Sequence, residues 1–306
     1  MVILLELASG FACAETQQAG KDFAILNMGF GGRASGMGNA QCAAASDGSA
    51  AFWNPAAMLF NRHIEMMSMQ AKLPSDADLY MLSGVLQNGE KGSKADSAWG
   101  FFWANGDMAN IPKTTPNAAV SPTTDVKPSD YFSYNTHVLG VSYANWLQTN
   151  LSYGLNLTGF YQSFSTIDQG TGYGLSFTPG FLWMVAPELA VGGVLRDAVN
   201  ITRWATGTSE TVLPELRLGT SYAPIPALLF AGEIRQKIDS RYQPTLHTGL
   251  EYRLWQFLRV RMGFDQDRIS GGCGIYVGNI DIQYAYVGDM TDGIGDSHRV
   301  SFGFGL

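Results

Sequence analysis

The amino-acid sequence predicts an all-β fold: a transmembrane antiparallel β-barrel of about 14 strands, preceded by a small N-terminal plug. Three observations predict this fold. Short segments of alternating apolar and polar residues follow one another to the last residue, charged residues are scarce, and short connections alternate with long ones. A strand places successive side chains on opposite faces, so an alternating segment has one apolar and one polar surface.

The alternation is clearest between about Leu213 and Leu306. In PTLHTGLEYRL, residues 244–254, leucine, threonine and tyrosine fall on one face, while histidine, glycine, glutamate and arginine fall on the other. Alternation and turn residues give an even set of candidate strands, which suits a closed bacterial barrel. They are expected near residues 62–73, 77–87, 96–106, 130–146, 149–165, 171–185, 188–197, 213–223, 227–236, 244–254, 256–266, 269–278, 279–287 and 297–306.

The composition indicates where the apolar face lies. Charged residues make up 15% of the 306 residues, against roughly 25% in typical soluble domains, and aromatic residues reach 12%. No apolar run reaches the roughly 18 residues that a helical span needs. A membrane barrel combines these properties, because its lipid face is apolar while each strand gives only a weak hydropathy signal. The net charge of -7 and the lack of a basic run exclude a nucleic-acid partner.

Connection lengths give an independent test of the strand assignment. Outer-membrane barrels have short periplasmic turns and long outer loops. If the first strand runs outward from the periplasm, short turns fall as expected near residues 147–148, 186–187, 224–226, 255–256 and 278–279, and long connections at 107–129, 198–212 and 288–296. Two connections break the alternation: 74–76 is short and 88–96 is long.

Three tryptophans, Trp146, Trp183 and Trp255, lie near the expected periplasmic strand ends. Tryptophan is enriched at membrane interfaces, so they are expected to form an aromatic girdle. The alternative is that they pack inside a soluble β-sandwich.

The chain divides into three parts. Residues 1–14 resemble a signal peptide, since an apolar stretch precedes Ala12-Cys13-Ala14, although no basic segment comes first. Residues 15–61 do not alternate and are expected to form the plug, and residues 62–306 form the barrel. The cysteines, Cys13, Cys42 and Cys273, indicate neither a disulfide framework nor a zinc site.

The plug segment is dense in glycine, alanine and serine, which allow backbones to pack closely, and Asn54-Pro55 is a turn or helix-start signal. A barrel of about 14 strands encloses more space than side chains of the wall fill. Gly29, Gly31 and Ala34 superficially match a dinucleotide-binding fingerprint, but no strand-helix-strand units follow, so nucleotide binding is not expected.

This segment resembles the N-terminal signature of the PorV/PorQ family, within the wider FadL-like outer-membrane barrels. Weaker similarities follow at Leu213-Pro214, at Gly249 to Gly263 and at the closing strand, whereas the Leu306 ending departs from an aromatic terminus. The plug motif consists of Arg33, Gly36, Met37, Gly38, Asp47, Asn54, Pro55 and Ala56, and the closing strand contributes His298, Arg299, Ser301 and Phe304, the last as the nearest aromatic assembly signal.

The resemblance implies a 14-stranded barrel with a plug, in the outer membrane of a Gram-negative bacterium. FadL-like relatives transport hydrophobic small molecules, and PorV-like relatives serve type IX secretion by engaging signal domains of exported proteins. The expected partners are therefore outer-membrane lipid, together with secreted proteins, other secretion components or a hydrophobic ligand.

Charged residues at inward positions form a second set of candidates. One interpretation is a polar lumen that orients the plug or a passing solute. The favoured alternative is a hydrated ladder of ion pairs, each contributing roughly 0–1 kcal/mol. Arg33 is expected to pair with one of the carboxylates. The set comprises Glu215 with Arg217, Glu233 with Arg235, Glu251 with Arg253, and Arg259 and Arg261.

No enzymatic activity, metal or cofactor is expected. The four histidines, His63, His137, His247 and His298, lack metal-ligand spacing, and no catalytic motif occurs. Three functions remain. The first is a PorV-like secretion component that binds partners through the loops 107–129 and 198–212. The second is a FadL-like channel for an apolar solute. The third is a soluble all-β binding protein.

Overall fold

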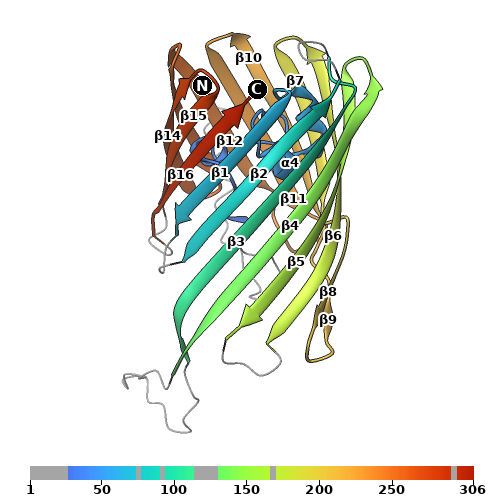
Figure 1. Cartoon of the computed structure of the whole chain (residues 1–306), viewed down its shortest axis with the longest axis vertical. Coiled ribbons are helices and arrows are strands. Elements are labelled where there is room, and N and C mark those ends of the chain that lie inside the picture. The colour runs from blue at the N-terminus through green and yellow to red at the C-terminus, as the bar shows by residue number, and fades with distance from the viewer. Residues whose placement is uncertain (1–26, 74–76, 90–93, 114–129, 166–169, 291–294) are drawn as a thin grey trace.

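The computed structural model describes residues 27–73, 77–89, 94–113, 130–165, 170–290 and 295–306. The predicted leader, residues 1–14, lies outside the described residues. The chain forms one antiparallel barrel, in which β1 pairs with β16 and β5 with β6 to close the wall (Figure 1).

Fourteen strands make up the closed wall, in chain order, as the alternation predicts. All fourteen candidate segments correspond to a strand of the wall, with ends shifted by a few residues. The strands are β1 (Ile64–Lys72), β2 (Asp78–Asn88), β3 (Ser97–Lys113), β4 (Asp130–Gln148), β5 (Leu151–Phe164), β6 (Thr171–Ala186), β7 (Leu189–Arg196), β10 (Glu215–Ile225), β11 (Leu228–Lys237), β12 (Thr245–Trp255), β13 (Leu258–Asp265), β14 (Arg268–Val277), β15 (Ile280–Asp289) and β16 (Ser297–Gly305).

The two ends of the barrel differ. The end at which β16 finishes, at the top of Figure 1, carries the two-residue turns after β4, β6, β10, β12 and β14, and we call it the turn end. The opposite end, the loop end, carries most of the longer connections. Two connections differ: β13 and β14 are joined at the loop end by a two-residue turn, and residues 89–96 join β2 to β3 at the turn end, where the sequence also predicts a long connection. Strands β3 to β6 extend farther toward the loop end than β10 to β16 do, so one side of the wall is taller (Figure 1).

The connection 198–212, expected to be an outer loop, contains two further strands, β8 (Val199–Trp204) and β9 (Ser209–Glu210). The long strand β6 pairs with β7 only as far as Gly180, and β8 pairs with the rest of it from Gly172 to Phe177. The chain bends between β7 and β8 at Asp197, whose φ is 53°. The expectation of a loop is wrong because a strand as long as β6 leaves backbone groups that need a partner.

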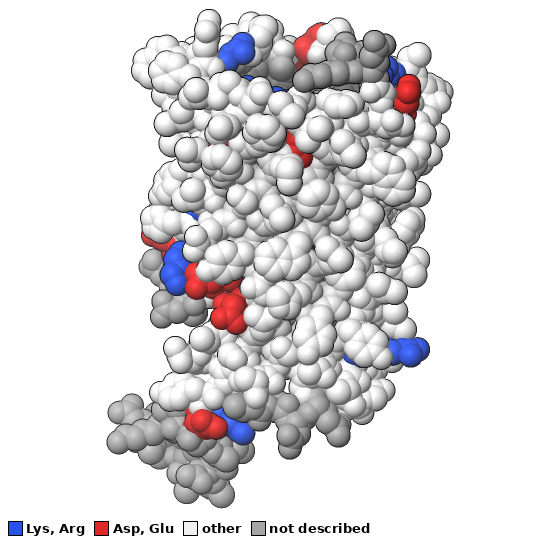
Figure 2. Space-filling view, viewed as in Figure 1, with Lys and Arg blue, Asp and Glu red and all other residues white. Residues whose placement is uncertain are grey.

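The outer surface of the wall is apolar. Leucine, isoleucine, valine and aromatic side chains point outward, and much of the surface in Figure 2 is free of charge. Charged groups lie near its top and bottom and in one cluster on the left at mid-height. With all strands paired around the wall, this surface matches the hydrocarbon core of a membrane.

The aromatic girdle is confirmed at two of three positions. Trp183 and Trp255 are exposed on the outer surface at the turn end. Trp146 instead points inward, where its Nε1 donates to the carbonyl oxygen of Ala95 at 2.7 Å and its ring meets Phe60. The girdle assignment is wrong for Trp146 because it shares the inward face of β4 with Ala144.

The plug segment, residues 27–61, lies inside the barrel in its half nearer the turn end (Figure 1). It contains α3 (Gly32–Gly36), α4 (Ala50–Trp53) and the 3-10 helix η1 (Pro55–Phe60). Nearly all of its residues are buried. Among the described residues, no helix is long and apolar enough to cross a membrane.

The lipid-facing assignment predicts a large effect at Leu157, which is 55% exposed at the middle of β5. We expect Leu157→Arg to lower the free energy of unfolding by about 2–4 kcal/mol in bilayers, the cost of a cation near the midplane. Ser163→Arg, on the same face but at the loop end, should cost less than about 1 kcal/mol. Urea titration of tryptophan fluorescence in lipid vesicles measures both, and equal effects would contradict a membrane-embedded belt.

Candidate functional site: the interior of the barrel

Buried ion pairs join the plug to the wall. The Arg33 side chain of α3 places its Nε 3.0 Å from the Glu251 carboxylate of β12, and its Nη1 donates to the carbonyl oxygen of Ala44 at 2.8 Å. Glu251 also accepts from Arg261 Nε at 2.7 Å, and Arg259 Nη1 lies 3.4 Å away. One carboxylate therefore binds the plug and two arginines of the neighbouring strand.

Arg33 is fully charged in this setting. Burial alone would lower the pKa of its guanidinium, but the charges of Glu251 and Asp47 outweigh burial and raise the pKa above its usual value. The pairing of Arg33 with a wall carboxylate, expected from its charge, is present.

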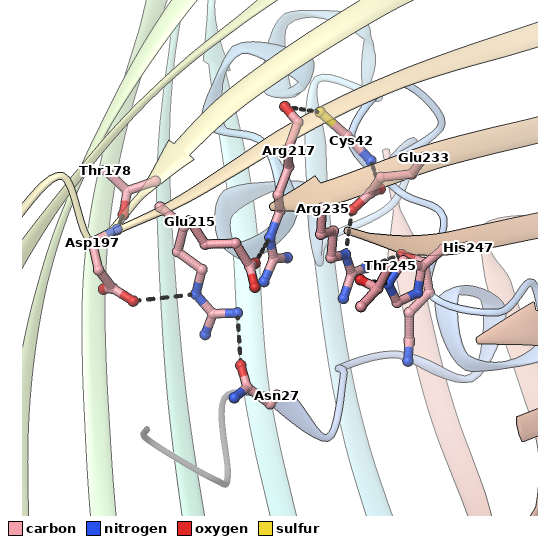
Figure 3. A network of polar contacts seen from close by, with 12 residues as sticks. Asn27, Cys42, Thr178, Asp197, Glu215, Arg217, Glu233, Arg235, Thr245 and His247 are labelled. Carbon is pink, nitrogen blue, oxygen red and sulfur yellow. Dashed lines mark hydrogen bonds and ion pairs between the residues drawn. The ribbon is translucent and has the colours of Figure 1, made fainter. Parts of the chain in front are cut away.

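A second group of charged side chains lies around plug residues 39–42 (Figure 3). Glu215 pairs with Arg217 at 2.5 Å, and Glu233 pairs with Arg235 at 2.6 Å. The Glu233 carboxylate accepts the backbone N–H of Cys42 at 2.7 Å, and Arg235 Nη2 donates to the Asn39 carbonyl at 2.6 Å. Glu233 and Arg235 thus satisfy plug backbone groups that no helix or strand satisfies.

The interpretation of these charges as a hydrated ladder is wrong. Arg217, Glu233, Arg235, Glu251 and Arg261 are each at most 7% exposed. Water cannot screen such pairs, and the plug fills the space in which a hydrated lumen was expected. Of these five residues, Glu233, Arg235 and Glu251 bind the plug directly.

The expected pairing of Glu251 with Arg253 is also wrong. Arg253 is exposed at the turn end of β12, where its Nη2 donates to the Pro226 carbonyl at 3.0 Å. Glu251 instead faces Arg261 directly across the β12–β13 pair. Residues two apart on one strand share a face, but the residue opposite on the next strand is closer.

His247 adds a contact that the sequence analysis did not assign. Its Nδ1 lies 2.9 Å from Asp265 Oδ1 and 3.2 Å from the Gly38 carbonyl oxygen, and its Nε2 lies 3.1 Å from Thr245 Oγ1. Asn39 Nδ2 of the plug donates to the other oxygen of Asp265 at 2.6 Å. The sequence does contain a signal for this contact. His247 lies four residues before Glu251 on β12, and residues an even number apart on a strand share a face, so both point inward.

Glycines let plug and wall backbones touch. Gly38 has φ +61°, and a Cβ there would lie 2.4 Å from the Phe264 carbonyl oxygen and 2.5 Å from that of Thr248. A Cβ on Gly263 would lie 2.1 Å from the backbone nitrogen of Gly38. Only glycine fits these two contacts. At Gly36 a Cβ would meet Gly272 at 3.4 Å, the near limit of an ordinary contact. Met37, between Gly36 and Gly38, is fully buried.

The remaining plug-motif residues organise its second half. Asp47 Oδ1 accepts from the backbone nitrogen of Ser49 at 2.9 Å. Asn54 Nδ2 donates to the Cys42 carbonyl at 2.6 Å, and its Oδ1 accepts from Ala56 N at 3.1 Å, which caps η1 beginning at Pro55. These residues hold the plug's own fold.

The side chains of the closing strand β16 alternate between the barrel interior and the outer surface. Arg299 and Ser301 point inward: Arg299 Nη1 donates to the Met28 carbonyl at 2.5 Å, and Ser301 Oγ accepts from the Gly32 nitrogen at 2.9 Å. His298 and Phe304 point outward, where His298 lies 2.7 Å from the Tyr284 hydroxyl.

The inner face of β1 to β6 carries many large apolar side chains among small uncharged polar ones, which the sequence analysis did not predict. It had placed the apolar face of each strand in lipid and the polar face inside. Among the described residues, the barrel interior therefore has a side on β10 to β16 that is rich in charge and a side on β1 to β6 that is mostly uncharged. The buried apolar residues include Met67, Met69, Leu79, Met81, Phe102, Val138, Phe160 and Leu182.

No group of three or more metal-binding side chains occurs among the described residues. The Cys42 thiol is buried in the plug, and burial together with the nearby Glu233 carboxylate raises its pKa well above the usual value. It is therefore a poor nucleophile at neutral pH.

Solved structures with a similar fold are outer-membrane transporters. The P. putida toluene transporter TodX matches with a TM-score of 0.66 and 10% identity, over 91% of this chain and 99% of that one. The Ralstonia pickettii toluene transporter TbuX gives 0.63 and 13%, over 91% and 98%. A Pseudomonas aeruginosa FadL homologue gives 0.57 and 12%, over 89% and 97%.

No protein-family model matches the chain, and a search of curated proteins finds no match. The FadL-like fold expected from the sequence is confirmed, whereas the finer PorV/PorQ resemblance is not shown. A closed barrel of this kind with an apolar belt is a bacterial outer-membrane protein.

Proposed function

We propose that this barrel is a channel that carries small hydrophobic molecules across the outer membrane. The observation that supports it is the cluster of large apolar side chains on the inner face of β1 to β6, which lies against the plug and offers a surface for an apolar solute. A pore for ions or polar nutrients has a polar interior. The similar transporters, named for toluene and for FadL, have the same architecture.

Type IX-like secretion, the function first expected from the family resemblance, is not carried forward. It rested on the PorV/PorQ resemblance, with large outer loops as candidate docking surfaces. Of these, 198–212 is largely strand, and residues 114–129 of the connection 107–129 lie outside the described residues. No contact among the described residues favours a protein partner.

The test is the uptake of an apolar probe by intact cells. N-phenyl-1-naphthylamine fluoresces in phospholipid and is kept out by an intact outer membrane. We expect cells of a Gram-negative host that display the barrel to take it up several-fold faster than cells with an empty vector.

Hydrolysis of a polar β-lactam by a periplasmic enzyme is the control. Its rate should not change, because the plug blocks polar solutes. Uptake of the apolar probe at the vector rate would refute the proposed function, and a parallel rise in both rates would indicate a leaking barrel rather than a selective one.

A further inference from the structure

The plug meets the wall along two unlike lines of contact. Along the first, which we call the polar seam, residues 29–44 contact β10 to β16 through buried ion pairs, hydrogen bonds and glycine backbones. Parting this seam would leave buried carboxylates and guanidinium groups without partners, which is costly.

The second line, the methionine seam, lies at β1 and β2. Met67, Met69 and Met81 point inward and are at most 3% exposed, and Met69 faces Met81 across the strand pair. Glycines of the plug lie against them: a Cβ on Gly48 would be 3.1 Å from the Met67 Cβ, and one on Gly31 would be 3.5 Å from its sulfur.

The polar contacts of the methionine seam are weak. The Gly31 N–H donates to the Met69 thioether at 3.1 Å, and thioether sulfur is a poor acceptor. Elsewhere on these two strands, Gln87 Nε2 binds carbonyls at the end of η1, near the turn end. Between that point and the loop end, the described plug and β1–β2 meet mainly through apolar groups. The exception on the inner face is the Ser83 hydroxyl opposite Met67, which is buried and has no hydrogen-bond partner among the described residues.

The contacts of the plug with β4, β5 and β6 are more firmly tied. Ser142 Oγ of β4 donates to the Ala51 carbonyl at 2.9 Å, and Ser152 Oγ of β5 donates to that of Ala56 at 3.0 Å. On β6, the Phe181 carbonyl accepts from Asn54 at 2.9 Å. Separation along the seam at β1 and β2 therefore breaks weaker polar contacts than separation along β4 to β6.

We propose that apolar solutes pass between the plug and the wall along the methionine seam, with Met67, Met69 and Met81 as the side chains that move aside. Methionine is unbranched and flexible and fits irregular apolar shapes, so these residues set the range of solutes accepted. The charged side of the plug stays in place during passage. This inference rests on the proposed function and adds its route and its specificity-determining residues.

Two matched disulfides test the route. Gly48→Cys with Met67→Cys locks the methionine seam. Gly219→Cys locks the polar seam to the native Cys42, because a Cβ on Gly219 lies 3.0 Å from the Cys42 Cβ, nearly the separation of the first pair. Both spacings are slightly shorter than the roughly 3.8 Å of a relaxed disulfide, so both need a similar small shift.

We expect the methionine-seam lock to reduce uptake of N-phenyl-1-naphthylamine at least tenfold, and a reductant to restore it. The polar-seam lock should leave uptake within twofold of the wild type. The inference is overturned if both locks block uptake, if neither does, or if only the polar-seam lock does. Wild-type uptake at the vector rate would instead refute the proposed function itself.

A second pair of variants separates side-chain stiffness from volume. Met69→Ile with Met81→Ile keeps an apolar seam but replaces flexible side chains by β-branched ones. Uptake should fall several-fold, with a larger loss for a bulkier naphthalene probe, in barrels that still show heat-modifiable gel migration. Leu182→Ile, a buried change on β6, should leave uptake unchanged. Equal uptake by all these variants would count against the methionines as specificity residues.

Discussion

Replacing Glu251 by alanine is expected to lower the free energy of unfolding by about 3–5 kcal/mol, the cost of breaking a buried ion pair by removing one partner. Glu251 is 7% exposed and is the carboxylate partner of Arg33 and Arg261, with Arg259 nearby. Its loss leaves buried positive charge on both sides of the boundary between plug and wall. The plug and β13 should therefore lose order together.

Arg253→Ala is the matched control, since Arg253 lies two residues away on the same strand and is exposed. Its removal should change stability by no more than about 0.5 kcal/mol, as is usual for surface positions. Urea unfolding of the barrel in detergent micelles measures both variants. Similar values for the two would mean that Glu251 is hydrated after all.

The double variant Arg33→Ala with Glu251→Ala isolates the contact between plug and wall. If the two residues act as a pair, the double variant should be less destabilised than the sum of the single variants by about 0.5–3 kcal/mol. This coupling free energy between Arg33 and Glu251 should persist at high salt, because buried pairs are screened little. A hydrated ladder would lose its coupling under the same conditions.

The strands of this fold follow from the sequence because their signal is local. A period of two identifies each strand by itself, and connection lengths then give the order around the wall. The strand β8 was missed although Val199, Ile201 and Arg203 alternate with Asn200 and Thr202. Its partner is the far half of β6, and a strand that lies beside only half of its neighbour breaks the simple alternation of strand and turn.

The contacts within the barrel are less predictable because they depend on register. Sequence spacing pairs Glu251 with Arg253, yet the register of β12 with β13 places Arg261 opposite. The apolar interior at Met67 and Met81 could not follow from a rule that assigns polar residues to a lumen, because that rule assumes water inside. The plug occupies the space that water would fill, so inward residues of β1 and β2 such as Met67 and Met81 pack against the plug.

A methyl group added to Gly263 is expected to unseat the plug. A Cβ at this position would lie 2.1 Å from the Gly38 nitrogen and 2.4 Å from the Met37 carbonyl carbon. Backbone atoms cannot rotate away as a side chain can, so the plug must shift as a unit. The Asn39–Asp265 and His247–Gly38 bonds beside it should then break. Overpacking of this kind costs about 1–3 kcal/mol, and the displaced plug should raise single-channel conductance several-fold in planar bilayers.

Gly271→Ala provides the comparison, because it makes the same change on the adjacent strand β14. A Cβ there would meet its nearest atom, the Arg261 carbonyl oxygen, at 3.8 Å, an ordinary contact. Its conductance and stability should match the wild type. If the Gly263 variant also conducts like the wild type, the plug does not rest on this glycine. If it conducts more while Glu251 remains bound to Arg33, the plug has pivoted about its charged contacts, and the glycine contacts and ion pairs hold it independently.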